Sequence, residues 1–140
     1  MTLTHETRRL THRGVLAMLS AAVAKAEDMG QPQCIVIVDP SGLQLGEIRM
    51  TGSKFLSLRS ALAKALTAAS HGVASESIPE AVRPAIAAAT EGGVTGLPGG
   101  LPIRIGGVLV GGIGVGSGRP DQDLEVARAA LAAVGAEEVR

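Results

Sequence analysis

The sequence predicts an α+β fold, a layered domain in which helices cover an antiparallel β-sheet. Two stretches, residues 34–50 and 101–115, carry aliphatic runs on both sides of a turn sequence and are predicted to form β-hairpins. Segments with helical periodicity precede, separate and follow these hairpins. Because the pattern contains hairpins and no strand–helix–strand repeats, we expect an antiparallel sheet, and 140 residues suit a single domain spanning 1–140.

A first helix is predicted over residues 4–29. Thr4 is a suitable N-cap, and small or apolar residues then recur at helical spacing in an Ala-rich stretch. Gly30 follows, where a left-handed residue commonly ends a helix.

The first hairpin follows at residues 34–50. Its turn is Asp39-Pro40-Ser41-Gly42, with Asp first, Pro second and Gly last, as a type I turn prefers. Cys34, the only cysteine, stands at the start of the first strand and is expected to be buried.

The second strand of this hairpin has an irregular pattern. Leu43 and Leu45 fall on one face, whereas Ile48 and Met50 fall on the other, so the alternation slips by one residue. A β-bulge at Gly46 explains the slip.

A second helix is predicted from the cap Ser53 to His71, with Gly72 closing it. The helix is amphipathic at 100° per residue. Its polar side is interpreted either as a solvated face or as the wall of a pocket. The apolar side holds Phe55, Leu58, Leu62, Ala65, Leu66 and Ala69, and the polar side holds Ser60, Lys64, Thr67 and His71.

Residues 73–96 have a weaker pattern. Pro79 and Pro84 interrupt any long helix, and only residues 84–93 suit a short one, with Pro84 in its first turn. A last helix is predicted from Pro120 to just before Gly135, with acidic residues near its positive N-terminal end.

Twelve of the nineteen glycines lie in residues 92–118. Neither a dinucleotide fingerprint nor a P-loop occurs, so these glycines are assigned to the sheet rather than to a phosphate site. Gly106-Gly107 suits a two-residue hairpin turn, and glycines 111, 112, 114 and 116 would let another backbone or subunit approach one face. The Leu97–Pro102 loop is read either as a plain loop or as a small anion nest with free N–H groups.

Charge and composition exclude several partners. Thirteen basic and thirteen acidic residues cancel, which disfavours nucleic acid and anionic membrane surfaces. A single aromatic residue removes the stacking surfaces that single-stranded nucleic acid requires. No apolar run could span a bilayer, and no signal sequence is recognised, so we expect a cytoplasmic protein.

Three segments together resemble a known family: "VIVDPSGLQLGEIRM", "AKALTAA" and "LPGGLPI…GVLVGGIGVGSGRPDQDLEVARAALAA". The family includes GlcG-like proteins, haem-binding HbpS-like proteins and the C-terminal domain of PduO-type corrinoid proteins. The resemblance implies a sheet of about five strands and a homo-oligomer, from a dimer to an octamer. Residues 73–96 do not follow a recognised pattern, and Thr51-Gly52 replaces the usual Asp-Gly. The matching residues are Arg49, Met50, Lys64, Thr67, Pro98, Gly99, Gly100 and Asp123.

The candidate site combines the polar side of the second helix with these family positions. Arg49 and Lys64 could bind a carboxylate, with Thr67, Pro98, Gly99, Gly100 and Asp123 as further ligand-binding residues. His71 could ligate a metal centre or transfer a proton, and Lys64 could act as a nucleophile. His5 and His12 share a helix face but lack a third ligand, so they are expected to be surface residues.

Three hypotheses about function remain. In the first, the protein binds haem, a corrinoid or another anionic small molecule, which predicts an apolar cleft lined by Met and Ala. In the second, it is a cofactor-independent enzyme acting on an organic acid, with Arg49, Lys64 and a carboxylate such as Asp123 or Glu91 in one pocket. In the third, it is a structural oligomer without a pocket.

Overall fold

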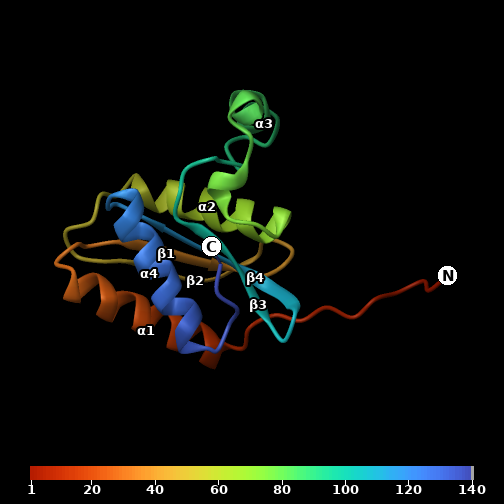
Figure 1. The fold of residues 1–140 in the computed structure, drawn as a ribbon, viewed down its shortest axis with the longest axis horizontal. Coiled ribbons are helices and arrows are strands. Elements are labelled where there is room, and N and C mark those ends of the chain that lie inside the picture. Colours follow the sequence, from red (N-terminus) through yellow and green to blue (C-terminus); the bar gives the residue numbers. More distant parts are fainter. Residues whose placement is uncertain (140) are drawn as a thin grey trace.

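The structure is a computed structural model that describes residues 1–139. It has the predicted α+β fold: α1 and α4 lie side by side on one face of an antiparallel sheet, and α2 covers the other face (Figure 1). The sheet has the strand order β2-β1-β4-β3, so the described residues form four strands instead of about five. The elements are α1 (His12–Asp28), β1 (Cys34–Val38), β2 (Gln44–Arg49), α2 (Ser57–His71), α3 (Arg83–Ala89), β3 (Gly100–Ile105), β4 (Val108–Gly116) and α4 (Pro120–Ala133), with short 3-10 helices at Ser75–Ser77 and Glu80–Val82.

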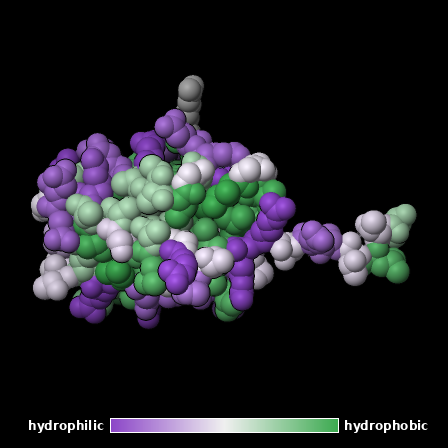
Figure 2. Space-filling model, turned by 90° about the horizontal axis from the view of Figure 1, so that it is seen from below, coloured by the Kyte–Doolittle hydropathy of each residue, from purple (hydrophilic) through white to green (hydrophobic). Residues whose placement is uncertain are grey.

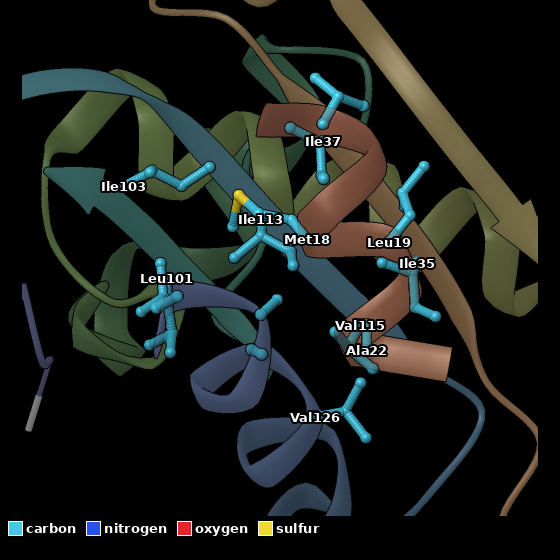
Figure 3. Close-up of a cluster of buried hydrophobic side chains, with 14 of the residues drawn as sticks. Met18, Leu19, Ala22, Ile35, Ile37, Leu101, Ile103, Ile113, Val115 and Val126 are labelled. Carbon is cyan, nitrogen blue, oxygen red and sulfur yellow. The ribbon is translucent and has the colours of Figure 1, made fainter. Parts of the chain in front are cut away.

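The main core lies between the sheet and the α1–α4 layer. Met18 of α1 and Val126 of α4 are fully buried there, against isoleucines and valines of the strands (Figure 3). Alternate residues of β1 divide between the two faces, as the pleat of a strand requires. Ile35 and Ile37 enter this core, whereas Val36 joins the thinner apolar layer beneath α2.

Helix α2 approaches β4 closely because β4 carries glycine on that face. A Cβ atom on Gly112 or Gly114 would overlap the carbonyl oxygen of Ala65 or Ala61, respectively. The prediction that these glycines admit another backbone is therefore confirmed, and the approaching backbone is a helix of the same chain.

The first helix begins later than predicted. It starts at His12, and the Thr11 hydroxyl accepts a hydrogen bond from the Gly14 N–H at 3.3 Å, so Thr11 rather than Thr4 is the N-cap. Residues 1–9 are exposed and form a tail that leaves the body (Figure 1). Leu10 is the first side chain to enter the core, and a helix before it would have no apolar face to bury.

Both hairpins form as predicted. The Gly42 N–H donates to the Asp39 carbonyl oxygen at 3.0 Å across the first turn, and Cys34 is buried at the start of β1. The bulge is confirmed beside Gly46: Ile37 pairs with Gly46 and Val38 with Gln44, which leaves Leu45 unpaired. In the second hairpin, Gly106 and Gly107 have φ angles of 58° and 79°, as a type I′ turn requires.

The second helix differs from the prediction at its start and in its burial. It begins at Ser57 without a side-chain cap, and the Ser53 hydroxyl donates to the Met50 carbonyl oxygen at 2.6 Å instead of capping the helix. Lys64 and Thr67 are 4% and 0% exposed, whereas Phe55 is 65% exposed. The solvated-face interpretation is therefore wrong for Lys64 and Thr67.

The short helix α3 stands away from the body (Figure 1). The helix has Pro84 in its first turn, as predicted. It ends at Ala89, whereas the sequence predicted an end at residue 93. None of its residues is buried. The last helix matches its prediction, and Gly135 has the left-handed conformation expected beyond its end.

Candidate functional site

Lys64 and Asp123 form a buried ion pair that joins the two helical layers. The Lys64 Nζ donates to Asp123 Oδ2 at 3.2 Å and to the Val115 carbonyl oxygen at 2.7 Å. Lys64 comes from α2 and Asp123 from the first turn of α4, and each residue is 4% exposed. Because the ammonium group already has two oxygen partners in a buried position, Lys64 is poorly suited to bind a ligand carboxylate or to act as a nucleophile.

The Pro98–Gly100 loop covers this ion pair. A Cβ atom on Gly99 would lie 3.0 Å from Lys64 Nζ and 2.6 Å from the Val115 carbonyl oxygen, so only glycine lets the loop pass so near. The Gly100 N–H donates to the Ser75 hydroxyl at 3.0 Å. Because that N–H already has an acceptor within the protein, it is not free to form part of an anion nest.

Thr67 forms hydrogen bonds with the segment that follows α3. Its hydroxyl donates to the Ala63 carbonyl oxygen at 2.7 Å and accepts the Thr95 N–H at 2.9 Å. Its hydrogen-bonding groups are engaged within the chain, as buried polar groups usually are.

His71 is exposed at the C-terminal end of α2. Its Nδ1 lies 3.2 Å from the Thr67 carbonyl oxygen. Donation from Nδ1 to that oxygen leaves the lone pair on Nε2, which is the form that ligates metals. His71 contributes to none of the five cavities described for residues 1–139.

Arg49 lies apart from Lys64 and His71. It lines a cavity of about 690 Å³ between the end of α1 and the end of β2, with walls that include Val23, Ala26 and Met50. β1 separates β2 from β4, where Lys64 is bound. Glu27 and Arg49 make this cavity partly polar, so it matches the apolar Met- and Ala-lined cleft expected for a binding protein only in Met50 and Ala26. The expected pocket containing both Arg49 and Lys64 is not found among the five cavities described for residues 1–139.

A second cavity on the same side of the sheet contains a histidine. His12, at the start of α1, lines a space of about 480 Å³ together with Arg9, Val15 and Leu45. His12 is exposed, as the sequence suggested. Its place in a cavity wall was not foreseen, because the cavity depends on where α1 begins and on the tail that precedes it.

Arg9 also contributes to the charge around this second cavity. Its guanidinium lies 3.8 Å from Asp39 Oδ2. Burial raises the pKa of Asp39, but hydrogen bonds from Ser41 and from the Leu43 N–H, together with Arg9, outweigh burial and hold that pKa below its ordinary value. The Asp39 side chain is therefore a carboxylate at neutral pH and keeps the base of the tail near β2.

Within residues 1–139, no cluster of three or more His, Cys, Asp or Glu side chains could hold a metal ion. No helix in the described part of the chain is long and apolar enough to cross a membrane.

Comparisons with known proteins agree with the fold. A family model described as "Haem degrading protein HbpS-like" matches residues 10–132. The corrinoid adenosyltransferase PduO of Citrobacter freundii is 34% identical over 119 residues, which are 81% of this chain and 36% of that protein. The chain thus spans about a third of the length of this curated relative.

Two solved structures have the same architecture. PduOC in complex with haem has a TM-score of 0.86 and 27% identity, over 94% of this chain and 99% of that one. HbpS has a TM-score of 0.84 and 30% identity, over 95% of each chain.

Proposed function

Because the chain belongs to the family of HbpS-like haem degrading proteins, we propose that it binds haem, or a corrinoid, as a tetrapyrrole-binding protein. The cavity beside His12 and Arg9 carries this proposal. A relative of the same fold has been solved in complex with haem, which supports the choice of ligand class.

The residues of this cavity fit the chemistry of a tetrapyrrole. Imidazole is a common axial ligand of haem iron. The guanidinium of Arg9 can pair with a carboxylate at the edge of the macrocycle, and Val15 and Leu45 offer aliphatic surface to the ring. The bound macrocycle would supply the metal centre, while the protein would hold and orient it.

His71 is the competing metal ligand. Its Nε2 is suited to ligation, and Arg104 donates to the carbonyl oxygen of the next residue, Gly72, at 2.7 Å, but none of the five cavities described for residues 1–139 includes His71. A ring bound there would rest on an open surface, so His12 is the better candidate on physical grounds.

Haem titration tests this proposal. We expect a saturable shift of the Soret band in the native chain and, in His12→Ala, binding weakened by about tenfold or more. His5→Ala is the matched control, because His5 lies in the exposed tail, and it should bind like the native chain. Loss of the shift in His71→Ala alone would assign the site to the end of α2. Absence of a saturable shift in the native chain would contradict haem binding, and the same titration with a corrinoid would test the other ligand.

The larger cavity favours a second candidate function, binding of a small organic acid. Arg49 and Glu27 both line it, and within residues 1–139 neither side chain takes part in an ion pair. Arg49 could bind a carboxylate, and Glu27 could accept a hydrogen bond from a hydroxyl or ammonium group. A thermal-shift screen of short carboxylic acids against the native chain and Arg49→Ala would detect such a ligand, and assays of the acids that bind would detect turnover. If neither haem nor an acid binds, a structural oligomer remains.

We also propose self-association as part of this function. Helix α3 has no buried residue, and Phe55, Leu56 and Leu97 are each more than half exposed. Apolar side chains also gather beside the base of the N-terminal tail, on the face seen in Figure 2. A gathered apolar patch on an exposed face, rather than the single exposed side chains, is what favours contact with further copies of the chain.

A further inference from the structure

The start of α2 has an apolar cavity at the surface. Phe55, the only aromatic residue of the chain, is 65% exposed, and the adjacent Leu56 is 60% exposed. Both side chains line a cavity of about 330 Å³, together with Lys54, Ser57 and Ser60. Aromatic side chains contribute strongly to cores and interfaces, so an exposed phenyl ring in a cavity wall is suited to receive an apolar side chain from elsewhere.

The segment that forms this cavity carries only positive charge. Residues 48–75 contain no Asp or Glu, and Lys54 and Arg59 are exposed basic residues at the start of α2. Neither takes part in an ion pair among residues 1–139. An apolar segment with acidic neighbours would therefore match this surface in both polarity and charge.

The projection that carries α3 has these properties. No residue of α3 is buried, and Ile86 is the largest aliphatic side chain among its four alanines. Residues 76–92 contain three acidic residues and one basic residue, Arg83. Glu80 and Glu91, on the two sides of α3 in the sequence, are exposed and form no ion pair within residues 1–139.

The projection is held away from the cavity of its own chain. Arg83 Nε donates to the Ile78 carbonyl oxygen at 2.9 Å, which ties α3 to the segment before it. The Thr67 hydroxyl accepts the Thr95 N–H at 2.9 Å, which fixes the returning segment to the second half of α2. Thr67 lies ten residues beyond Ser57, which is about 15 Å along a helix. A second copy of the chain is therefore the occupant that leaves these hydrogen bonds intact.

The projection and the cavity lie on the same side of the sheet. Figure 1 shows α3 beyond α2, on the side of the sheet opposite to α1. Two copies that face each other through this side can be related by a two-fold axis, with each α3 over the start of the partner's α2. Such a pair forms the same contact twice.

We propose that α3 of one copy docks into the cavity at the start of α2 of a second copy. Ile86 packs against Phe55, and Glu80 and Glu91 lie beside the basic residues of the α2 start. This inference rests on the proposed self-association and names the surfaces through which it occurs. The contact uses the α2 side of the molecule, whereas the apolar patch of Figure 2 lies beside the base of the N-terminal tail.

Charge reversal tests the contact. The α3 variant, Glu80→Lys/Glu91→Lys, and the α2 variant, Lys54→Glu/Arg59→Glu, should each show the molar mass of a single chain in light scattering, at a concentration at which the native chain is associated. Each variant places like charges opposite one another in the contact. An equimolar mixture of the two variants should associate again, because every α3 then meets an α2 start of opposite charge.

The matched control is Arg13→Glu/Arg128→Glu, which makes the same change of charge as the α2 variant. These exposed residues belong to α1 and α4 on the other face of the sheet, so this variant should associate like the native chain. A monomeric native chain would refute the self-association itself, and this inference with it. If the native chain and both reversal variants associate equally well, self-association stands and this contact is rejected. Reversal variants that stay single chains when mixed would also overturn the contact.

Fluorescence tests the same contact without a change of charge. Phe55→Trp introduces the only tryptophan of the chain. Its emission should move to shorter wavelength as the concentration rises through the range in which the native chain associates, because the indole passes from water into contact with α3. Adding Ile86→Asp should abolish this shift. An emission wavelength that stays constant while the molar mass rises would place the contact elsewhere and overturn the proposal.

Discussion

Lys64 Nζ lies 3.2 Å from Asp123 Oδ2 in the interior of the protein, and this pair connects α2 on one face of the sheet to α4 on the other. Charged side chains are rarely fully buried unless they are paired. Removing one partner leaves the other as an uncompensated charge in a site with little access to water.

Single substitutions in this pair should therefore be severe. We expect Lys64→Met to lower the free energy of unfolding by about 3–5 kcal/mol, measured by urea denaturation. The double variant Lys64→Met/Asp123→Leu should recover part of that loss, because neither charge is then left alone. If Lys64→Met were as stable as the native protein, the pair would not connect the layers in solution.

Asp39 should make stability depend on pH in the acidic range. Its pKa is held below the ordinary value of 3.8 by the Ser41 and Leu43 hydrogen bonds and by Arg9, despite the opposing effect of burial. A lowered pKa favours the folded state fully above pH 3.8, and this contribution is lost as the pH falls through the lower, folded-state pKa. The stability difference between the native protein and Asp39→Asn should thus be constant near neutrality and shrink below pH 3.8. Asp121→Asn, at a fully exposed position, is the control and should change stability little at any pH.

Gly114 should be irreplaceable in β4. A Cβ atom there would overlap the Ala61 carbonyl oxygen and the backbone of α2, so Gly114→Ala should lower the free energy of unfolding by about 1–3 kcal/mol or more. Gly116→Ala is the matched control in the same strand, because its Cβ would lie 3.1 Å from the nearest atom, the Ser57 carbonyl oxygen, and should cost less. Equal stability losses in a chemical denaturation series would argue against the close approach of α2.

The start of α1 can be measured with a pair of threonines. Thr11→Ala removes the hydroxyl that accepts the Gly14 N–H, and should cost about 1 kcal/mol. Thr4→Ala should leave stability unchanged, because Thr4 lies in the exposed tail. If Thr4→Ala cost more stability than Thr11→Ala, the helix would begin near Thr4, as the sequence pattern predicted.

These results indicate which features a sequence of this kind can predict. The turns at Asp39–Gly42 and Gly106-Gly107 depend on local chemistry, and both form as expected. The burial of Lys64 depends on the Pro98–Gly100 loop, which returns over α2 from more than thirty positions further along the chain. Helical periodicity does not reveal that a distant loop covers part of a helix. The sequence pattern therefore left two interpretations of the helix face that carries Lys64, a solvated face or the wall of a pocket.

The candidate site was predicted less completely, for a related reason. Arg49 and Lys64 were joined through family positions, but a position in a motif does not state how far apart two side chains lie across the sheet. The structure separates them across β1. His12 acquires a cavity only because α1 starts at that residue, which is a property of tertiary packing.

Self-association should depend on α3. A helix of seven residues is too short to be stable alone in water, and none of its side chains is buried by the body of the chain. A second copy packed against Ile86 and the neighbouring alanines would supply the missing contacts. Ile86→Asp should therefore reduce the molar mass measured by light scattering after gel filtration, while Ser70→Asp, at an exposed position of α2, should not. An unchanged mass in Ile86→Asp would show that another surface holds the copies together, and a monomeric native protein would contradict self-association altogether.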